Sequence, residues 1–245
     1  MKRIIYIAYL SLLALILISC EQENVAPNGA LAATTPDAAR TSCQSYNYLT
    51  KTGVFQFGNV RTDYILVGFA DNVTPAQQQA LLSQYTIFDQ IDGEFFTDSG
   101  IVTIVKLTGN ATCSQVEQML SDLEKKNEVN FATPTFNDPN GVFSWIGQTN
   151  EFIVTLKNAK QYRQLEQLAR ITRTTIVTSI TDEIYILSAD KNSVGDALQM
   201  SSLFNLSPFV ASAEPNFLLQ APPLRSGAKA EYKSSKILMP AQAVQ

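Results

Sequence analysis

The chain has 245 residues, of which 45% are hydrophobic and 16% are charged, and its formal net charge is −4. This composition predicts packed domains rather than a disordered chain, and the acidic balance argues against a nucleic-acid-binding protein, which usually presents a basic face. The sequence has no histidine, so neither a Ser-His-Asp nor a Cys-His catalytic arrangement can form within it. Three widely separated cysteines do not predict a metal cluster. We therefore expect a non-enzymatic protein without metal or cofactor.

The first segment, residues 1–19, has the features of an export signal. Lys2 and Arg3 precede an apolar run that is shorter than the roughly 20 residues of a membrane-spanning helix. The run ends in Leu-Ile-Ser-Cys, which resembles a bacterial lipobox and implies cleavage before Cys20 and lipidation of that residue. An uncleaved anchor helix is the alternative. We expect a lipoprotein of the bacterial cell envelope, held at the outer membrane by its lipid, and the acidic stretch after Cys20 resembles signals for export to the cell surface.

Residues 20–42 are rich in Ala, Pro, Asn and Thr without periodicity, which predicts a flexible tether. If Cys20 is lipidated, Cys43 and Cys113 remain as a pair in an oxidising compartment, and we expect a disulfide between them. Two separately buried thiols are the alternative.

The next part of the chain predicts a β-α-β-β-α-β unit. An apolar, β-rich run covers Tyr64–Phe69, and Thr74-Pro75-Ala76-Gln77 combines an N-cap, a helix-initiating proline and a capping-box glutamine. The second helix carries the apolar stripe Val116, Met119, Leu120 and Leu123. The other predicted elements are strands over residues 85–91, 101–107 and 129–136 and a capping box at residues 114–117.

Residues 138–150 are predicted to link two domains. Asn137–Gly141 is a dense cluster of turn-forming residues. Val142, Phe143, Trp145 and Ile146 follow, and four large apolar residues in a connector indicate that it docks against a domain. An extra edge strand is the alternative interpretation.

The second unit follows the same course. Helices are predicted around Tyr162–Ala169 and after Ser193–Asp196, and a tight hairpin turns at Thr181-Asp182. The predicted strands cover residues 151–157, 174–180, 184–188 and 210–219.

An internal repeat relates the two units. Val129–Phe136 and Val210–Phe217 share the frame V-x-x-A-x-P-x-F. A repeat of about 80 residues can close its own core, unlike a solenoid unit of roughly 20 to 50 residues. We therefore predict an α+β protein with two tandem ferredoxin-like domains with antiparallel sheets, at residues 43–137, including an N-terminal extension, and 151–219. In that fold the helices cover one face of the sheet, and the other face is solvated or bound by a partner. Residues 220–245 are predicted to be a disordered tail.

The final strand of the second unit resembles a known family. Its motif is Val210-x-x-Ala213-Glu214-Pro215-Asn216-Phe217, and the unit begins Glu151-Phe152-Ile153-Val154. This pattern is similar to the end of the N-terminal prodomains of subtilisin-family (fervidolysin-like) proteases, and the likeness covers about residues 151–217. The first unit resembles the family more weakly, because Thr133 and Thr135 replace Glu and Asn. Glu214 is interpreted as a structural residue at a strand end rather than as a catalytic acid.

The resemblance implies a protease-binding role. In that family the prodomain lays its open sheet face on two helices of the protease, assists folding of the catalytic domain, and passes its C-terminal extension through the active-site cleft. The acidic tip Asp182-Glu183 would then point at helix N-termini of the protease. The protease-binding candidates are Ile176, Thr178, Ile180, Asp182, Glu183, Tyr185, Leu187, Gln220, Ala221, Pro222, Pro223 and Leu224.

The sequence departs from the family because no catalytic domain follows the repeats, the unit is doubled, and a lipobox precedes it. The first hypothesis is a prodomain-like inhibitor or folding chaperone of a subtilisin-like protease in trans. The alternatives are a cell-surface binding or scaffold module for another protein or polymer, and a catalytically empty remnant of a secreted subtilisin-like protease.

Overall fold

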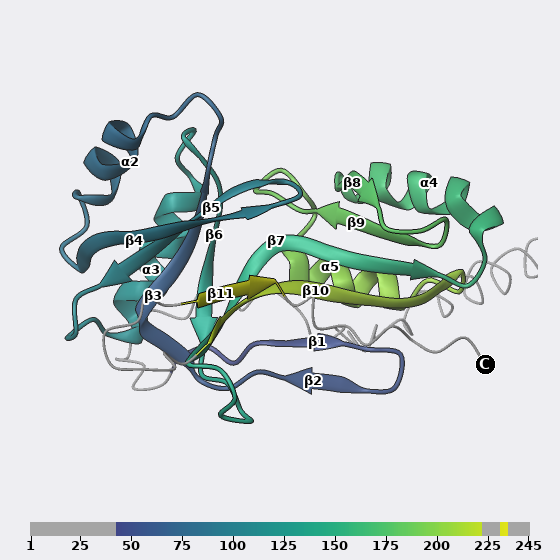
Figure 1. Ribbon diagram of the computed structural model, residues 1–245, viewed down its shortest axis with the longest axis horizontal. Coiled ribbons are helices and arrows are strands. Elements are labelled where there is room, and N and C mark those ends of the chain that lie inside the picture. Colours follow the sequence, from purple (N-terminus) through teal and green to yellow (C-terminus); the bar gives the residue numbers. More distant parts are fainter. Residues whose placement is uncertain (1–42, 222–230, 235–245) are drawn as a thin grey trace, which may run out of the picture. The chain divides into compact units, whose positions relative to one another are not determined.

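The computed structural model describes residues 43–221 and 231–234 (Figure 1). The expected signal peptide, the lipidation site at Cys20 and the tether lie outside these residues, as do Pro222, Pro223 and Leu224. Within the described ranges, no helix is long and apolar enough to cross a membrane.

The first half of the described chain contains two helices and four strands, preceded by a small hairpin. The hairpin consists of β1 (Asn47–Leu49) and β2 (Val54–Gln56). The elements that follow are β3 (Val60–Phe69), α2 (Pro75–Leu82), β4 (Phe88–Thr97), β5 (Gly100–Leu107), α3 (Cys113–Glu124) and β6 (Val129–Phe136).

The second half repeats this order and adds a strand. Its elements are β7 (Trp145–Leu156), the short 3-10 helix η1 (Ala159–Gln161), α4 (Tyr162–Thr172), β8 (Thr175–Ser179), β9 (Ile184–Ser188), α5 (Ala197–Asn205), β10 (Val210–Ala221) and β11 (Glu231–Ser234). The fold is therefore α+β with antiparallel strand pairs.

Local capping explains where the helices begin. Thr74 caps α2 and forms the expected capping box with Gln77. The cap of α3 differs from the expectation, because Thr112 rather than Ser114 is the N-cap and it pairs with Gln115. Both Thr112 and Ser114 have an acceptor side chain three residues before a Gln or Glu, so the local pattern did not distinguish the two starts.

All strands except β1 and β2 join one nine-stranded sheet. In the first half the strand order is β6-β3-β5-β4, and in the second half it is β10-β7-β9-β8. The two sets are connected because Thr135 and Phe136 of β6 pair with Gly147 and Ile146 of β7. The expectation of two separate tandem domains is therefore wrong, and residues 145–150 of the expected linker belong to β7.

Each half has its own helix-side core. The first core lies between α2, α3 and the strands of the first half, with Ile65, Leu82 and Met119 fully buried. The second lies between α4, α5 and the strands of the second half, with Phe152, Leu165 and Phe204 fully buried. The apolar stripe expected on α3 faces the first core.

A third core covers the opposite face of the first half. Leu66, Val102 and Ile104 alternate with the residues of the first core and therefore point to the other side of the sheet. They pack against Trp145 at the start of β7 and Leu218 near the end of β10. The open face of the first half is thus covered by the second half of the same chain, rather than by solvent or another molecule.

The N-terminal extension contacts both halves. A disulfide joins Cys43 to Cys113 at the start of α3, as expected from the sequence. Farther along, the Leu49 N–H donates to Ser202 Oγ on α5 at 2.9 Å, and Asn205 Nδ2 donates to the Leu49 carbonyl at 2.7 Å. The extension therefore ties α3 of the first half to α5 of the second.

The expected disordered tail includes a strand. Glu231–Ser234 forms β11, which pairs antiparallel with Leu218–Ala221 at the end of β10 (Figure 1). Residues 220 and 221 accordingly belong to β10.

Candidate functional site

The structure places some of the expected protease-binding residues inside the protein. Leu187 is fully buried in the second core, and Ile176 and Tyr185 pack against that core. The Tyr185 ring lies 5.2 Å from the Tyr162 ring at the start of α4. These three residues face the helices, so the expectation that they lie on the open sheet face is wrong. Because side chains alternate along a strand, Ile186 rather than Leu187 lies on the open face of β9. Ile186 is also buried.

The exposed members of the expected set are Thr178, Ile180, Asp182 and Glu183. They lie on β8 and at the tip of the β8–β9 hairpin. The tip is ordered locally, because Thr181 Oγ1 accepts hydrogen bonds from the N–H groups of Glu183 and Ile184 at 3.2 and 3.1 Å. The two carboxylates of the tip therefore project from a fixed turn into solvent.

The expected tail residues Gln220 and Ala221 are held in the sheet. Gln220 pairs with Trp145 on one side and Tyr232 on the other, and its carbonyl accepts a hydrogen bond from the Ser144 N–H at 2.8 Å. Ala221 pairs with Glu231. In this arrangement both residues are part of the protein's own sheet.

The family motif on β10 has a structural role. Asn205 at the end of α5 accepts from the Ala213 N–H at 2.8 Å and donates to the Ala213 carbonyl at 2.6 Å. Ala213 and Val210 are fully buried in the second core, and Phe217 contacts the Phe57 ring. Glu214 points outward and contributes, after burial, to raising the pKa of Tyr48 to about 12.

A buried polar network joins the motif to the rest of the sheet. Glu151 is fully buried, and its carboxylate accepts from Asn216 Nδ2 at 2.8 Å and from the Ser99 N–H at 2.6 Å. Asn216 Oδ1 in turn accepts from Ser234 Oγ on β11 at 2.5 Å, and Thr149 Oγ1 donates to the Asn216 carbonyl. The network links the β4–β5 hairpin, β7, β10 and β11.

The role of Glu151 could not be predicted from the sequence. A single carboxylate at the start of the apolar run Phe152–Leu156 was the available signal, because a charge at the edge of a buried strand needs donors. Those donors come from residues 52 and 65 positions away. Local patterns do not reveal such distant partners.

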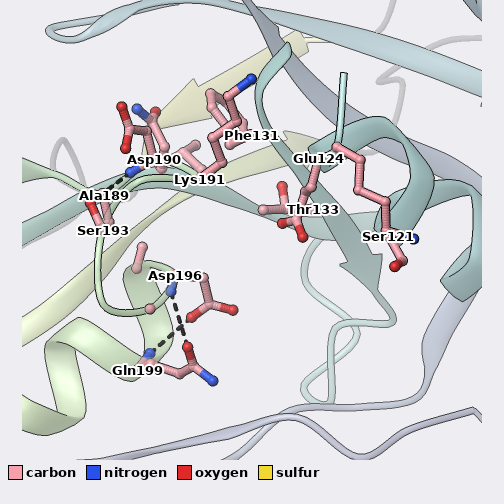
Figure 2. A pocket seen from close by; sticks show the side chains of 15 residues that line it. Ser121, Glu124, Phe131, Thr133, Ala189, Asp190, Lys191, Ser193, Asp196 and Gln199 are labelled. Atoms are coloured by element: carbon pink, nitrogen blue, oxygen red, sulfur yellow. Dashed lines mark hydrogen bonds between the residues drawn. The ribbon is translucent and has the colours of Figure 1, made fainter. Parts of the chain in front are cut away.

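A hollow of about 420 Å³ lies between the two halves. Figure 2 shows Ser121, Glu124 and Thr133 of α3 and β6 on one wall, and Asp190, Ser193 and Asp196 of the segment before α5 on the other. A second hollow of about 250 Å³ shares Glu124, Thr133 and Asp196 with it and is bounded by the N-terminal extension.

Two carboxyl groups of this hollow, those of Asp196 and Glu124, have raised pKa values. Burial raises the pKa of Asp196, although the N–H groups of Gln199 and Leu198 oppose the shift by favouring the charged form. Burial and the neighbouring Asp196 charge raise the pKa of Glu124. Burial, followed by Glu117, Asp196 and Glu124, raises the pKa of the Tyr46 phenol.

The lysines around the hollow are engaged elsewhere. Lys125 forms an ion pair with Asp122 at 3.1 Å, and Lys191 Nζ donates to the Lys126 carbonyl at 2.5 Å. The carboxylates of the hollow can therefore accept hydrogen bonds from a polar group. Among residues 43–221 and 231–234, no three His, Cys, Asp or Glu side chains gather closely enough to hold a metal ion.

Comparison with known proteins does not add a family. No protein-family model matches the chain, and no curated protein matches it either.

Proposed function

We propose that the protein is a non-enzymatic lipoprotein of the bacterial cell envelope that binds a subtilisin-like protease as a prodomain-like inhibitor or folding chaperone. Each half would then be a ferredoxin-like unit, joined to the other through one sheet. The second half would carry the binding surface.

The observation that carries this proposal is the strand order of the second half. The order β10-β7-β9-β8, with α4 and α5 packed on one face, is that of a split βαβ unit. It supports the resemblance drawn from the motif on β10, because that motif lies on the strand that closes the unit.

In this proposal the first half does not bind the protease. Its sheet face is covered by Trp145 and Leu218. A face that is already packed is not available to a protease, so the first half serves as a support for the second. Apart from the chain after β10, the proposed contact surface is therefore limited to the exposed hairpin residues Thr178, Ile180, Asp182 and Glu183.

The acidic tip gives the first test. In an assay of a purified subtilisin-like protease on a chromogenic peptide, we expect the full-length chain to inhibit. The variant Asp182→Asn/Glu183→Gln should weaken inhibition about 3- to 30-fold, because each carboxylate near a helix N-terminus contributes about 0.3 to 1 kcal/mol. The matched control is Asp71→Asn/Glu94→Gln, which neutralises two exposed acids of the first half. Equal loss in both variants would show that net charge, rather than the tip, matters.

The tail gives the second test. In the proposed inhibitory mechanism, the chain after β10 enters the protease cleft, so a truncation after Ala221 should abolish inhibition. This truncation also removes Ser234, which donates to the buried Asn216. Ser234→Ala is therefore the control, because it loses the same hydrogen bond and keeps the tail. Full inhibition by a folded, truncated chain would reject the tail mechanism.

A scaffold for another envelope protein is the second candidate function. The two halves share one sheet and the third core, and a disulfide fixes the N-terminal extension. These connections join the described parts into one support. Capture of an unrelated envelope protein with no subtilisin-like protease, under conditions in which the protease assay is negative, would favour this candidate.

A further inference from the structure

Two edges of the sheet, formed by β4 and β8, differ in their chemistry. β4 carries Asp89, Asp92 and Glu94 and has two irregularities in its pairing with β5. Charged residues on an edge strand hinder pairing with another strand. The β4 edge is therefore protected against association.

The β8 edge lacks such charges. The run Thr174–Thr181 contains only Thr, Ser, Ile and Val, which favour extended structure. β8 is short and has one bulge, between Ile176 and Thr178. Within the described chain, only β9 forms backbone hydrogen bonds with Thr175–Ser179. The outward N–H and C=O groups of this strand are thus available to a second strand.

Opposite charges flank the two ends of this edge. Arg170 and Arg173 precede β8, and Asp182 and Glu183 follow it. All four side chains are exposed, and none of them forms an ion pair with another described residue. The edge therefore has a positive end and a negative end, separated by an uncharged strand.

We propose that two copies of the chain associate through antiparallel pairing of β8 with β8 of the second copy. A two-fold axis reverses one edge relative to the other, so each arginine end meets a carboxylate end. Pairing centred on Val177 places this residue opposite Val177 of the second copy. It also places Arg173 of each copy opposite Thr181 of the other, directly beside Asp182. Pairing two β4 edges would instead bring carboxylates together, which is destabilising.

The proposal does not depend on the proposed protease role, and its test contains no protease. The full-length chain with Val177→Cys, in membranes or mild detergent, is oxidised and analysed on a non-reducing gel. Residues that face each other across paired strands have Cβ atoms about 4.5 to 5.5 Å apart, within reach of a disulfide. We expect a dimer band that disappears on reduction.

Two controls define the background. The wild-type chain reports cross-links through its own three cysteines. Gln90→Cys places a cysteine at an exposed position of the β4 edge and should give no more dimer than the wild type. A Val177→Cys chain that yields no more dimer than Gln90→Cys overturns the proposal.

A charge swap tests the partner's identity and register. In the Val177→Cys background, Arg173→Glu and Asp182→Arg should each reduce the dimer band several-fold, because each introduces two like-charge contacts per dimer. The double variant restores both attractions and should recover the band. Failure of the double variant to recover it, with folding intact by circular dichroism, would contradict the antiparallel two-fold arrangement.

Discussion

Gly147 permits the close contact between the two halves. A Cβ atom at this position would lie 2.5 Å from Leu66 Cδ1 and 3.0 Å from the Trp145 ring. Because both neighbours are fully buried in the third core, neither has free space into which it can move. Gly147→Ala should therefore destabilise the protein by about 1 to 3 kcal/mol, the usual cost of overpacking a core.

Urea denaturation followed by circular dichroism measures this cost. Gly109→Ala is the matched control, because a Cβ there meets no atom within 4 Å and the residue does not have a positive φ. Equal stability of Gly147→Ala and the control would mean that β7 can move away from β3 without loss of packing.

Asp196 predicts a pH dependence of stability. Burial raises the pKa of its carboxyl above the ordinary value of 3.8, so the folded state binds the proton more tightly than the unfolded state does. The stability that Asp196 contributes is present at low pH and declines as the pH rises through the raised pKa. Asn is an equally good N-cap, so Asp196→Asn keeps the cap of α5 and removes the charge.

The Asp196→Asn variant should consequently be more stable than the wild type at pH 7. The difference should shrink as the pH approaches 4. Parallel urea titrations at several pH values measure it. A variant that is less stable at pH 7 would show that the hydrogen bonds to the carboxylate outweigh its desolvation.

At the scale of elements, the N-terminal extension is covalently linked to α3. The Cys43–Cys113 disulfide closes a loop of 70 residues, and on the chain-entropy account such a loop stabilises the folded state by up to about 4 kcal/mol. The double variant Cys43→Ser/Cys113→Ser should lose stability of this order in thermal or urea unfolding. Reductant should lower the stability of the wild type and leave the variant unchanged, and an equal response of the two would contradict the disulfide's role.

The elements could largely be predicted from the sequence where one face is apolar and the other polar. The stripe on α3, the cap at Thr74 and the strand Val129–Phe136 follow from local periodicity and turn chemistry. The side chains of β8 and β9 that face the helices could not be predicted this way. Ile184–Leu187 is apolar at every position, so alternation does not reveal which residues face the helices.

At the scale of the whole molecule, the two halves depend on each other. Leu66, Val102 and Ile104 would be exposed if the second half were absent, because Trp145 and Leu218 cover them. Separately produced segments 43–137 and 138–245 should therefore bind a hydrophobic dye and unfold with low cooperativity. The full chain should unfold in one transition. Cooperative, dye-free unfolding of both segments would contradict this dependence.

The repeat in the sequence indicated two similar units, but it could not show how they join. The apolar residues after Gly141 predicted a docking connector, and Trp145 does dock, as the first residue of a long strand. Its partners Leu66 and Leu218 are 79 residues before it and 73 after it in the sequence. Pairing over such distances depends on the complete sheet rather than on a local pattern.

The central claim is that this protein binds a subtilisin-like protease. The most direct measurement is a titration of such a protease, at fixed concentration, with the full-length chain, with residual activity and complex formation followed together. We predict that activity falls with added chain and that a complex is recovered by size-exclusion chromatography. Full activity together with no complex, for a folded chain and a panel of subtilisin-like proteases, would contradict the claim.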